Sequence, residues 1–384
     1  MRLLPVLATS CFVSSMSMRI VDPVVPDIAR DMAISAASAA LLASAFTFPY
    51  ALGQPLLGAL GDTLGKARII KISLAVMMLC LLAAAIAPSI DALYAARIIG
   101  GAAGGGIIPL AFALVGDRFA MLERQVALSK LLSAIIAGQL TGSVGSGLIA
   151  SQYGWRVSFV AATALAFAAL AMTLWQLKPR PLAERPPFKV SALGNGYRSV
   201  FKNPRTIVCF TAVFIEGIVV FGLFPYLAVM LEQRGAGGLK EAGFVLAGFA
   251  LGGFIYTALV RVMLDRLGLL NVMRVGGALA GLGFATLTLG GSWPVEMAVF
   301  VLIGVGFYML HNSLQTQATE LAPDARGSAV AAHAFFFFLG QAVGPIAYRI
   351  AFDSVGTTGA LLAAAVMMTL TGMLTAAGLS RRGV

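Results

Sequence analysis

The sequence predicts an all-α membrane protein in which twelve transmembrane helices form two pseudo-symmetric six-helix bundles. Of its 384 residues, 59% are hydrophobic and only 11% are charged. The apolar residues gather in about twelve runs that are each long enough to cross a bilayer. Only helices and closed barrels satisfy every backbone group in lipid, and barrel strands alternate in polarity over about ten residues. Continuous apolar runs of this length therefore indicate helices.

The predicted spans divide evenly between the two halves of the chain. The first bundle is expected within residues 1–178, with spans at 4–25, 38–60, 69–87, 91–115, 126–151 and 156–178. The second is expected within residues 206–384, with spans at 206–230, 240–262, 272–291, 294–317, 327–351 and 357–379. Residues 179–205 contain four prolines between positions 179 and 187 and several basic residues, and are predicted to be a cytoplasmic linker.

The second half also repeats landmarks of the first half in register. Asp62-Thr-Leu-Gly65 recurs as Asp265-Arg-Leu-Gly268 at an offset of 203. Gly138-Gln-x-x-Gly142 recurs as Gly340-Gln-x-x-Gly344 at an offset of 202. Internal duplication of this kind is typical of transporters built from two similar helical bundles.

The distribution of basic residues predicts the orientation and excludes some functions. The chain has 27 Lys and Arg residues and a net charge of +11. When residues near span ends are counted with the adjoining segment, five fall outside, two (Arg19 and Arg97) lie deeper within spans, and 20 fall inside. Both termini are therefore predicted to be cytoplasmic, with the chain in a bacterial inner membrane. No soluble basic domain suggests a nucleic-acid partner. The three cysteines have no metal-ligand spacing, and no cofactor is expected.

One loop motif and one helix motif resemble those of a known protein family. Gly58, Asp62, Gly65, Lys66 and Arg68 stand between the second and third spans. This pattern resembles the signature loop of the major facilitator superfamily. In the fifth span, Gly138, Gly142 and Gly147 resemble the glycine-rich motif of its twelve-helix drug/proton antiporters, but Ser143 stands where a proline is expected.

This resemblance implies a gate at the cytoplasmic side. Lys66 and Arg68 can pair with acids at the ends of other spans, such as Asp117, and so hold that side shut in one state. The alternative is an ordinary solvated loop that carries the positive charges expected on the inside.

A charged side chain at the centre of a membrane helix costs about 2.5–3.5 kcal/mol and is a functional suspect, and four residues of the predicted spans qualify. Asp22, Glu216 and Arg97 are candidate proton-coupling residues, and Arg19 lies one helical turn from Asp22. Asp22 and Pro26 resemble the first span of certain multidrug–proton antiporters, which implies a coupling role for Asp22. The alternatives are a plain ion pair with Arg19, a structural hydrogen bond from Glu216, and an Arg97 that bridges backbone carbonyls of the first span.

Further polar and aromatic residues are candidates for contact with a substrate. His311 and Gln315 share a helix face, and each histidine could join a proton path or make a helix–helix hydrogen bond. Two histidines on different helices do not predict a metal site. The candidate substrate-binding residues are Arg19, Tyr50, Gln139, Phe224, Tyr226, His311, Asn312, Gln315, His333 and Gln341.

Together these features predict a secondary transporter and not an enzyme. The leading hypothesis is a monomer that exports small hydrophobic or amphipathic compounds in exchange for protons, by alternating access. The alternative on the same fold is a proton symporter or uniporter for a sugar or small organic acid, which the departure at Ser143 keeps open.

Overall fold

The computed structural model describes residues 3–119, 121–177 and 197–381, and these are almost entirely helical. The chain divides into two compact units, Met1–Phe188 and Lys189–Val384. The division falls within the predicted linker 179–205, of which residues 179–196 lie outside the described part.

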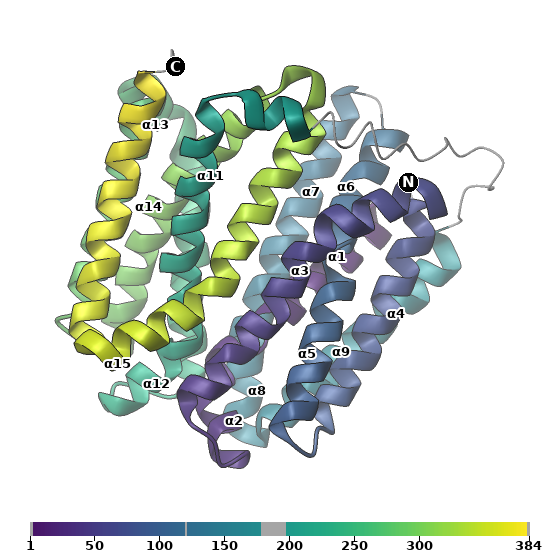
Figure 1. Cartoon of the computed structure of the whole chain (residues 1–384). Coiled ribbons are helices and arrows are strands. Elements are labelled where there is room, and N and C mark those ends of the chain that lie inside the picture. Colours follow the sequence, from purple (N-terminus) through teal and green to yellow (C-terminus); the bar gives the residue numbers. More distant parts are fainter. Residues whose placement is uncertain (1–2, 120, 178–196, 382–384) are drawn as a thin grey trace. The chain divides into compact units, whose positions relative to one another are not determined.

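Unit 1 is built from helices whose breaks follow the proline and glycine positions (Figure 1). The first span is interrupted at Asp22–Val24, since Pro23 lacks the N–H that an uninterrupted helix needs. The helices are α1 (Leu3–Arg19), α2 (Val25–Asp31), α3 (Ala36–Leu64), α4 (Lys66–Ala85), α5 (Ile90–Gly104), α6 (Ile107–Arg118), α7 (Met121–Leu140), α8 (Ser146–Tyr153) and α9 (Trp155–Gln176). Between α7 and α8 the chain makes a π-helical turn, η2 (Thr141–Gly145).

Unit 2 contains the longest helices of the described residues. Its helices include α11 (Arg205–Glu216), α12 (Leu227–Gln233), α13 (Leu239–Leu287), α14 (Trp293–Glu320) and α15 (Arg326–Ser380). A π-helical turn, η4 (Gly217–Phe221), and a 3₁₀ turn, η5 (Phe224–Tyr226), join α11 to α12.

Ten helices in the described residues are long and apolar enough to cross a membrane, whereas the sequence predicts twelve spans. The difference lies in α13 and α15, which are 49 and 55 residues long and each cover two predicted spans. Each contains one glycine with non-helical backbone, Gly268 at φ 71° and Gly356 at φ 69°. Glycine adopts this left-handed region without a steric penalty, so the helix can bend there with almost no loop.

The two units repeat the same close helix contacts. In unit 1, a Cβ at Gly138 of α7 would lie 2.2 Å from the Phe12 carbonyl oxygen of α1. In unit 2, a Cβ at Gly340 of α15 would lie 2.2 Å from the Phe214 carbonyl oxygen of α11. Both residues of the second contact stand 202 positions after those of the first. The duplication seen in the sequence therefore extends to backbone packing.

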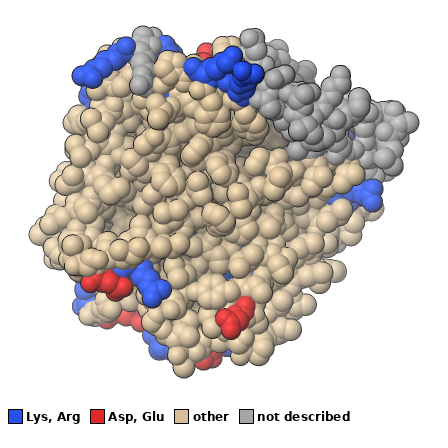
Figure 2. All heavy atoms as spheres, viewed as in Figure 1, with Lys and Arg blue, Asp and Glu red and all other residues tan. Residues whose placement is uncertain are grey.

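The outer surfaces of the helices are suited to lipid. On α15, Leu362, Val366, Leu370 and Leu374 are exposed at four-residue spacing, which places them on one face of the helix. Figure 2 shows the same division on the face it displays: charged side chains gather near the helix ends and are scarce along the helices. The chain is a multi-pass membrane protein.

Candidate functional site

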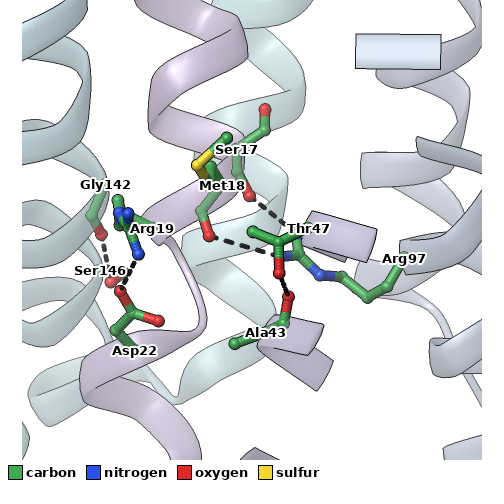
Figure 3. Close-up of polar contacts among 9 residues, drawn as sticks. All are labelled: Ser17, Met18, Arg19, Asp22, Ala43, Thr47, Arg97, Gly142 and Ser146. Atoms are coloured by element: carbon green, nitrogen blue, oxygen red, sulfur yellow. Dashed lines mark hydrogen bonds and ion pairs between the residues drawn. The ribbon is translucent and has the colours of Figure 1, made fainter. Parts of the chain in front are cut away.

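Unit 1 buries three charged side chains around the end of α1 (Figure 3). Arg19 is the last residue of α1, and Asp22 opens the turn that Pro23 imposes. Arg19 Nη1 lies 3.6 Å from Asp22 Oδ2, and their side chains are 5% and 0% exposed. Within the described residues neither Asp22 oxygen accepts a hydrogen bond, because 3.6 Å is too long for one. Asp22 is thus held mainly by charge.

Arg97 completes this ionic cluster (Arg19, Asp22 and Arg97) from α5. Its guanidinium donates to the carbonyl oxygens of Ser17 at 2.7 Å and Met18 at 3.4 Å, both on α1. Its Nε also donates to the Leu42 carbonyl oxygen of α3 at 3.3 Å. The guanidinium carbon lies 4.1 Å from the centre of the Phe46 ring. Arg97 therefore bridges backbone carbonyls of the first span, which is the structural alternative considered for it.

The glycine motif of the fifth span brings α7 and η2 against this cluster. A Cβ at Gly142 would lie 2.5 Å from the Met16 carbonyl oxygen and 3.1 Å from Arg19 Cβ. Gly147, in α8, is also buried. The absent side chains at Gly138 and Gly142 let the two backbones approach closely, so this motif positions α1 and the residues it carries.

Unit 2 contains a different polar group, the histidine cluster of Glu216, His311 and His333. Glu216 ends α11, is fully buried, and contacts His311 Nδ1 of α14 through Oε1. The rings of His311 and His333 lie 5.4 Å apart, although the two residues belong to α14 and α15. In the described part of the chain, Glu216 Oε2 and His333 Nε2 have no hydrogen-bond partner. Three titratable side chains thus meet in one buried place.

Aromatic rings surround the histidine cluster. The Phe307 ring stacks on His311 with centroids 5.0 Å apart, and the Phe337 ring lies 4.5 Å from it. Phe221 contacts both Phe307 and Phe337. His311 keeps 12% of its side chain exposed, whereas the Glu216 side chain is fully buried, so His311 is the more accessible of the two.

At duplicated positions the two units carry opposite chemistry. Arg19, Asp22 and Arg97 of unit 1 correspond to Phe221, Phe224 and Phe300 of unit 2, at offsets of 202, 202 and 203. Those phenylalanines contact one another, with centroids 5.0 Å apart for Phe221 and Phe224 and 6.1 Å for Phe224 and Phe300. Conversely, Glu216 corresponds to Ser14. The ionic cluster of unit 1 and the histidine cluster of unit 2 therefore occupy different positions of the repeat.

Comparisons with known proteins decide the family. A sequence model described as Major Facilitator Superfamily matches residues 7–345. The chain belongs to this superfamily. It is a transporter and not an enzyme.

Several relatives are similar to this major facilitator over most of its length. Multidrug resistance protein 1 of Bacillus subtilis is 24% identical, and the alignment covers 91% of this chain and 90% of that protein. The chloramphenicol resistance protein of Streptomyces lividans is 26% identical, over 88% and 85%. The multi-drug resistance efflux pump PmrA of Streptococcus pneumoniae is 25% identical, over 88% and 86%.

Solved structures show the fold alone, because they are only 15% identical. The nucleoside transporter NupG matches with a TM-score of 0.79 over 100% of both chains. The peptide transporter POT matches with a TM-score of 0.81 over 100% of this chain and 95% of its own.

The signature loop of this major facilitator joins α3 to α4 at Gly65. Gly65 has φ 96°, a conformation that favours glycine, and so permits the sharp turn. Lys66 Nζ lies 2.7 Å from Asp117 Oδ2 at the end of α6, while Arg68 is exposed. The side chain of Asp62 and the surroundings of Gly58 lie outside the described part. Lys66 and Asp117 thus tie the start of α4 to the end of α6.

The remaining candidate residues are scattered through both units. Tyr50 is fully buried near Phe46, and Gln139 is partly buried on α7. Tyr226 donates to the Pro345 carbonyl oxygen at 2.8 Å, which ties η5 to α15. The others lie in unit 2: Phe224 and Gln341 are buried, Asn312 is partly buried, and Gln315 is exposed.

Two ion pairs at helix ends were not expected from the sequence. Arg156 contacts Asp31 in unit 1, and Arg234 Nη1 lies 3.0 Å from Glu296 Oε1 in unit 2. Glu296 is 2% exposed, but it stands near a predicted span end and so was not recognised as a buried acid. The Trp-Pro-Val-Glu start of α14 offered a signal, because acids are favoured in the first turn of a helix.

Proposed function

We propose that this chain is a proton-coupled antiporter of a bacterial inner membrane that exports small hydrophobic or amphipathic compounds. The observation that carries the proposal is the buried contact between Glu216 and His311, beside His333. The export direction is supported by relatives named as multidrug resistance, chloramphenicol resistance and efflux proteins.

Charge balance favours Glu216 over Asp22 as the proton carrier. Asp22 lies beside Arg19, which stays protonated, so protonating Asp22 would remove the negative charge that balances this buried positive charge. Among the described residues, Glu216 contacts no Lys or Arg, and its neighbour His311 can be neutral. Glu216 can therefore gain a proton and leave no unbalanced charge behind.

The surroundings of Glu216 suit an apolar substrate. Phe307 and Phe337 pack against His311, and Phe337 is only partly buried. Aromatic faces with a few convergent polar groups are typical of pockets for small hydrophobic molecules. An amphipathic substrate that packs on these rings and donates a hydrogen bond to the ionised Glu216 carboxylate would lose that charge-assisted bond when Glu216 is protonated, so substrate and proton would compete at one place.

In this proposal α13 and α15 each cross the membrane twice. At about 1.5 Å per residue, 49 or 55 helical residues exceed twice the roughly 30 Å thickness of the hydrocarbon core. Bending at Gly268 and Gly356 then gives twelve spans in two bundles, with both termini cytoplasmic. The bundles would expose the site to each side in turn, and Lys66 with Asp117 would belong to the inner gate.

The membrane potential supplies enough energy for useful export. A potential of 100 mV is worth about 2.3 kcal/mol per charge, which corresponds to a concentration ratio of roughly fifty.

Transport in proteoliposomes with an imposed pH gradient tests the proposal. We expect wild-type protein to move a lipophilic dye against its gradient when the opposite side is acidified. Glu216→Gln should abolish the dependence on the pH gradient but still bind dye. Asp353→Asn, which removes an exposed carboxylate of the same unit, is the matched control and should transport as the wild type does. Gradient-driven transport by Glu216→Gln at the wild-type rate would refute the assignment.

A further inference from the structure

Unit 2 contains a cavity of about 800 Å³ that is separate from the histidine cluster. It lies where α12 ends, where α13 gives way to α14, and beside the bend of α15 at Gly356 (Figure 1). All of its lining residues belong to unit 2, and those used below are Gln233, Arg234, Gly290, Ser292, Thr357 and Thr358. Its size falls within the range of small-molecule sites.

The duplicated positions of unit 1 explain why this space is open. Trp155 and Arg156 correspond to Thr357 and Thr358 at an offset of 202. The glycines before them share a left-handed backbone, with φ 82° at Gly154 and 69° at Gly356. In unit 1 the tryptophan is a fully buried side chain, whereas in unit 2 a threonine leaves its place empty.

The same positions of unit 1 also form an ionic lock. Asp31 accepts hydrogen bonds from Trp155 Nε1 and Arg156, and Arg156 donates to the Ala87 carbonyl oxygen at 3.2 Å. Asp31 corresponds to Gln233 and Ala87 to Gly290, and both counterparts line the cavity. The cavity therefore stands where unit 1 has its lock, with every member of the lock replaced by a smaller or uncharged residue.

Arg234 is the one charged side chain among the described residues that line the cavity. Its Nη1 donates hydrogen bonds both to Glu296 Oε1, at 3.0 Å, and to the Leu287 carbonyl oxygen, at 3.2 Å. In the part of the chain that is described, no hydrogen bond or ion pair uses its Nη2 or Nε. The side chain is 26% exposed, so these N–H groups remain available to a ligand.

We propose that this cavity binds a small hydroxylated oxyanion, a carboxylate or a phosphate ester. The planar guanidinium of Arg234 would hold the anionic group through its remaining N–H donors, as arginine does for carboxylate and phosphate. Hydroxyls of Ser292, Thr357 and Thr358 and the amide of Gln233 would bind the hydroxyl groups of the ligand. The site is independent of proton coupling at Glu216.

Thermal unfolding of the purified full chain in uncharged detergent tests the site, with glycerol 2-phosphate as the probe. The phosphate ester should raise the unfolding midpoint of the wild type, while glycerol and matched sodium chloride should not. Thr357→Trp restores the side chain of unit 1 and should remove the shift. Leu362→Trp places a tryptophan on the exposed face of the same helix and should keep it.

A second variant tests the site independently, in case Thr357→Trp does not fold. Arg234→Lys keeps the positive charge beside Glu296 but lacks the planar guanidinium that can donate two N–H groups to one phosphate. It should weaken phosphate binding roughly tenfold. Equal shifts in the wild type, Thr357→Trp and Arg234→Lys, or no shift in the wild type, would overturn the proposal. Glu216→Gln should retain the full shift, so failure here and failure of proton coupling are distinguishable.

Lipid nanodiscs distinguish two sources of the anion. If the ligand is the phosphate of a lipid headgroup, phosphatidylglycerol should weaken glycerol 2-phosphate binding in the wild type and co-purify less with Thr357→Trp. If the ligand is a free solute, replacing phosphatidylcholine with phosphatidylglycerol should leave probe binding unchanged.

Discussion

The paired glycine contacts and one glycine in open space allow the same Gly→Ala change to be tested where opposite effects on stability are expected. A Cβ at Gly138 would meet the Phe12 carbonyl oxygen at 2.2 Å, and a Cβ at Gly340 would meet the Phe214 carbonyl oxygen at the same distance. Ordinary van der Waals contact begins near 3.4 Å, so alanine would force the helices apart by about an ångström in a close-packed interior.

We therefore expect Gly138→Ala and Gly340→Ala each to lower the free energy of unfolding by about 1–3 kcal/mol, the usual cost of overpacking. Gly116→Ala is the matched control, because a Cβ on this α6 glycine would meet no atom within 4 Å. It should be neutral or should stabilise by up to about 1 kcal/mol, since alanine loses less backbone entropy than glycine.

Unfolding of the purified protein by sodium dodecyl sulfate, followed by circular dichroism, measures all three values. Gly138→Ala and Gly340→Ala should lower the free energy of unfolding by similar amounts if the two units repeat their packing. Stabilities of Gly138→Ala and Gly340→Ala equal to that of Gly116→Ala would show that α1 does not pack on α7, or α11 on α15, as described here.

Three further changes follow from single contacts. Arg97→Lys removes the guanidinium that donates to backbone carbonyls of two helices. It should lower the free energy of unfolding by about 1.5–3 kcal/mol in the same assay, as expected for hydrogen bonds of a charged group. Tyr348→Phe deletes the hydroxyl that donates to the Val219 carbonyl oxygen at 2.8 Å in η4, and should cost about 1 kcal/mol; an unchanged stability would count against that bond. Lys66→Gln breaks a partly exposed pair with Asp117 and should change stability by less than about 1 kcal/mol, so a large fall in dye transport would indicate a role in gating.

The helical architecture was accessible from the sequence because lipid imposes strict requirements on it. Continuous apolar runs long enough to cross the bilayer indicate helices, and the repeated glycine positions indicated that the helix packing is duplicated. Gly138 and Gly340 illustrate this, since each meets the same carbonyl position on its partner helix. The exception is the number of helices: the chain bends at Gly268 and at Gly356 with almost no loop, so α13 and α15 each cover two predicted spans.

The histidine cluster was beyond the reach of sequence patterns. Glu216 and His311 are 95 residues apart and lie on different helices, so no local spacing links them. Each was singled out separately as a polar residue in an apolar span, but their contact depends on how α11 packs against α14. Arg97 is the opposite case, because an arginine inside a span has few partners except backbone carbonyls, and bridging of the first span was considered from the start.

The divergence between the units follows a physical rule. Positions that fix the backbone are kept: Gly154 and Gly356 share a left-handed φ, and Pro23 and Pro225 are each the second residue of a 3₁₀ turn. Side chains that fill the interior can change more freely, but removing one member of a buried ion pair leaves the other charge uncompensated. The members of such a pair are therefore expected to be gained or lost together. Phenylalanines stand at all three unit 2 counterparts of the ionic cluster, as this coupling requires.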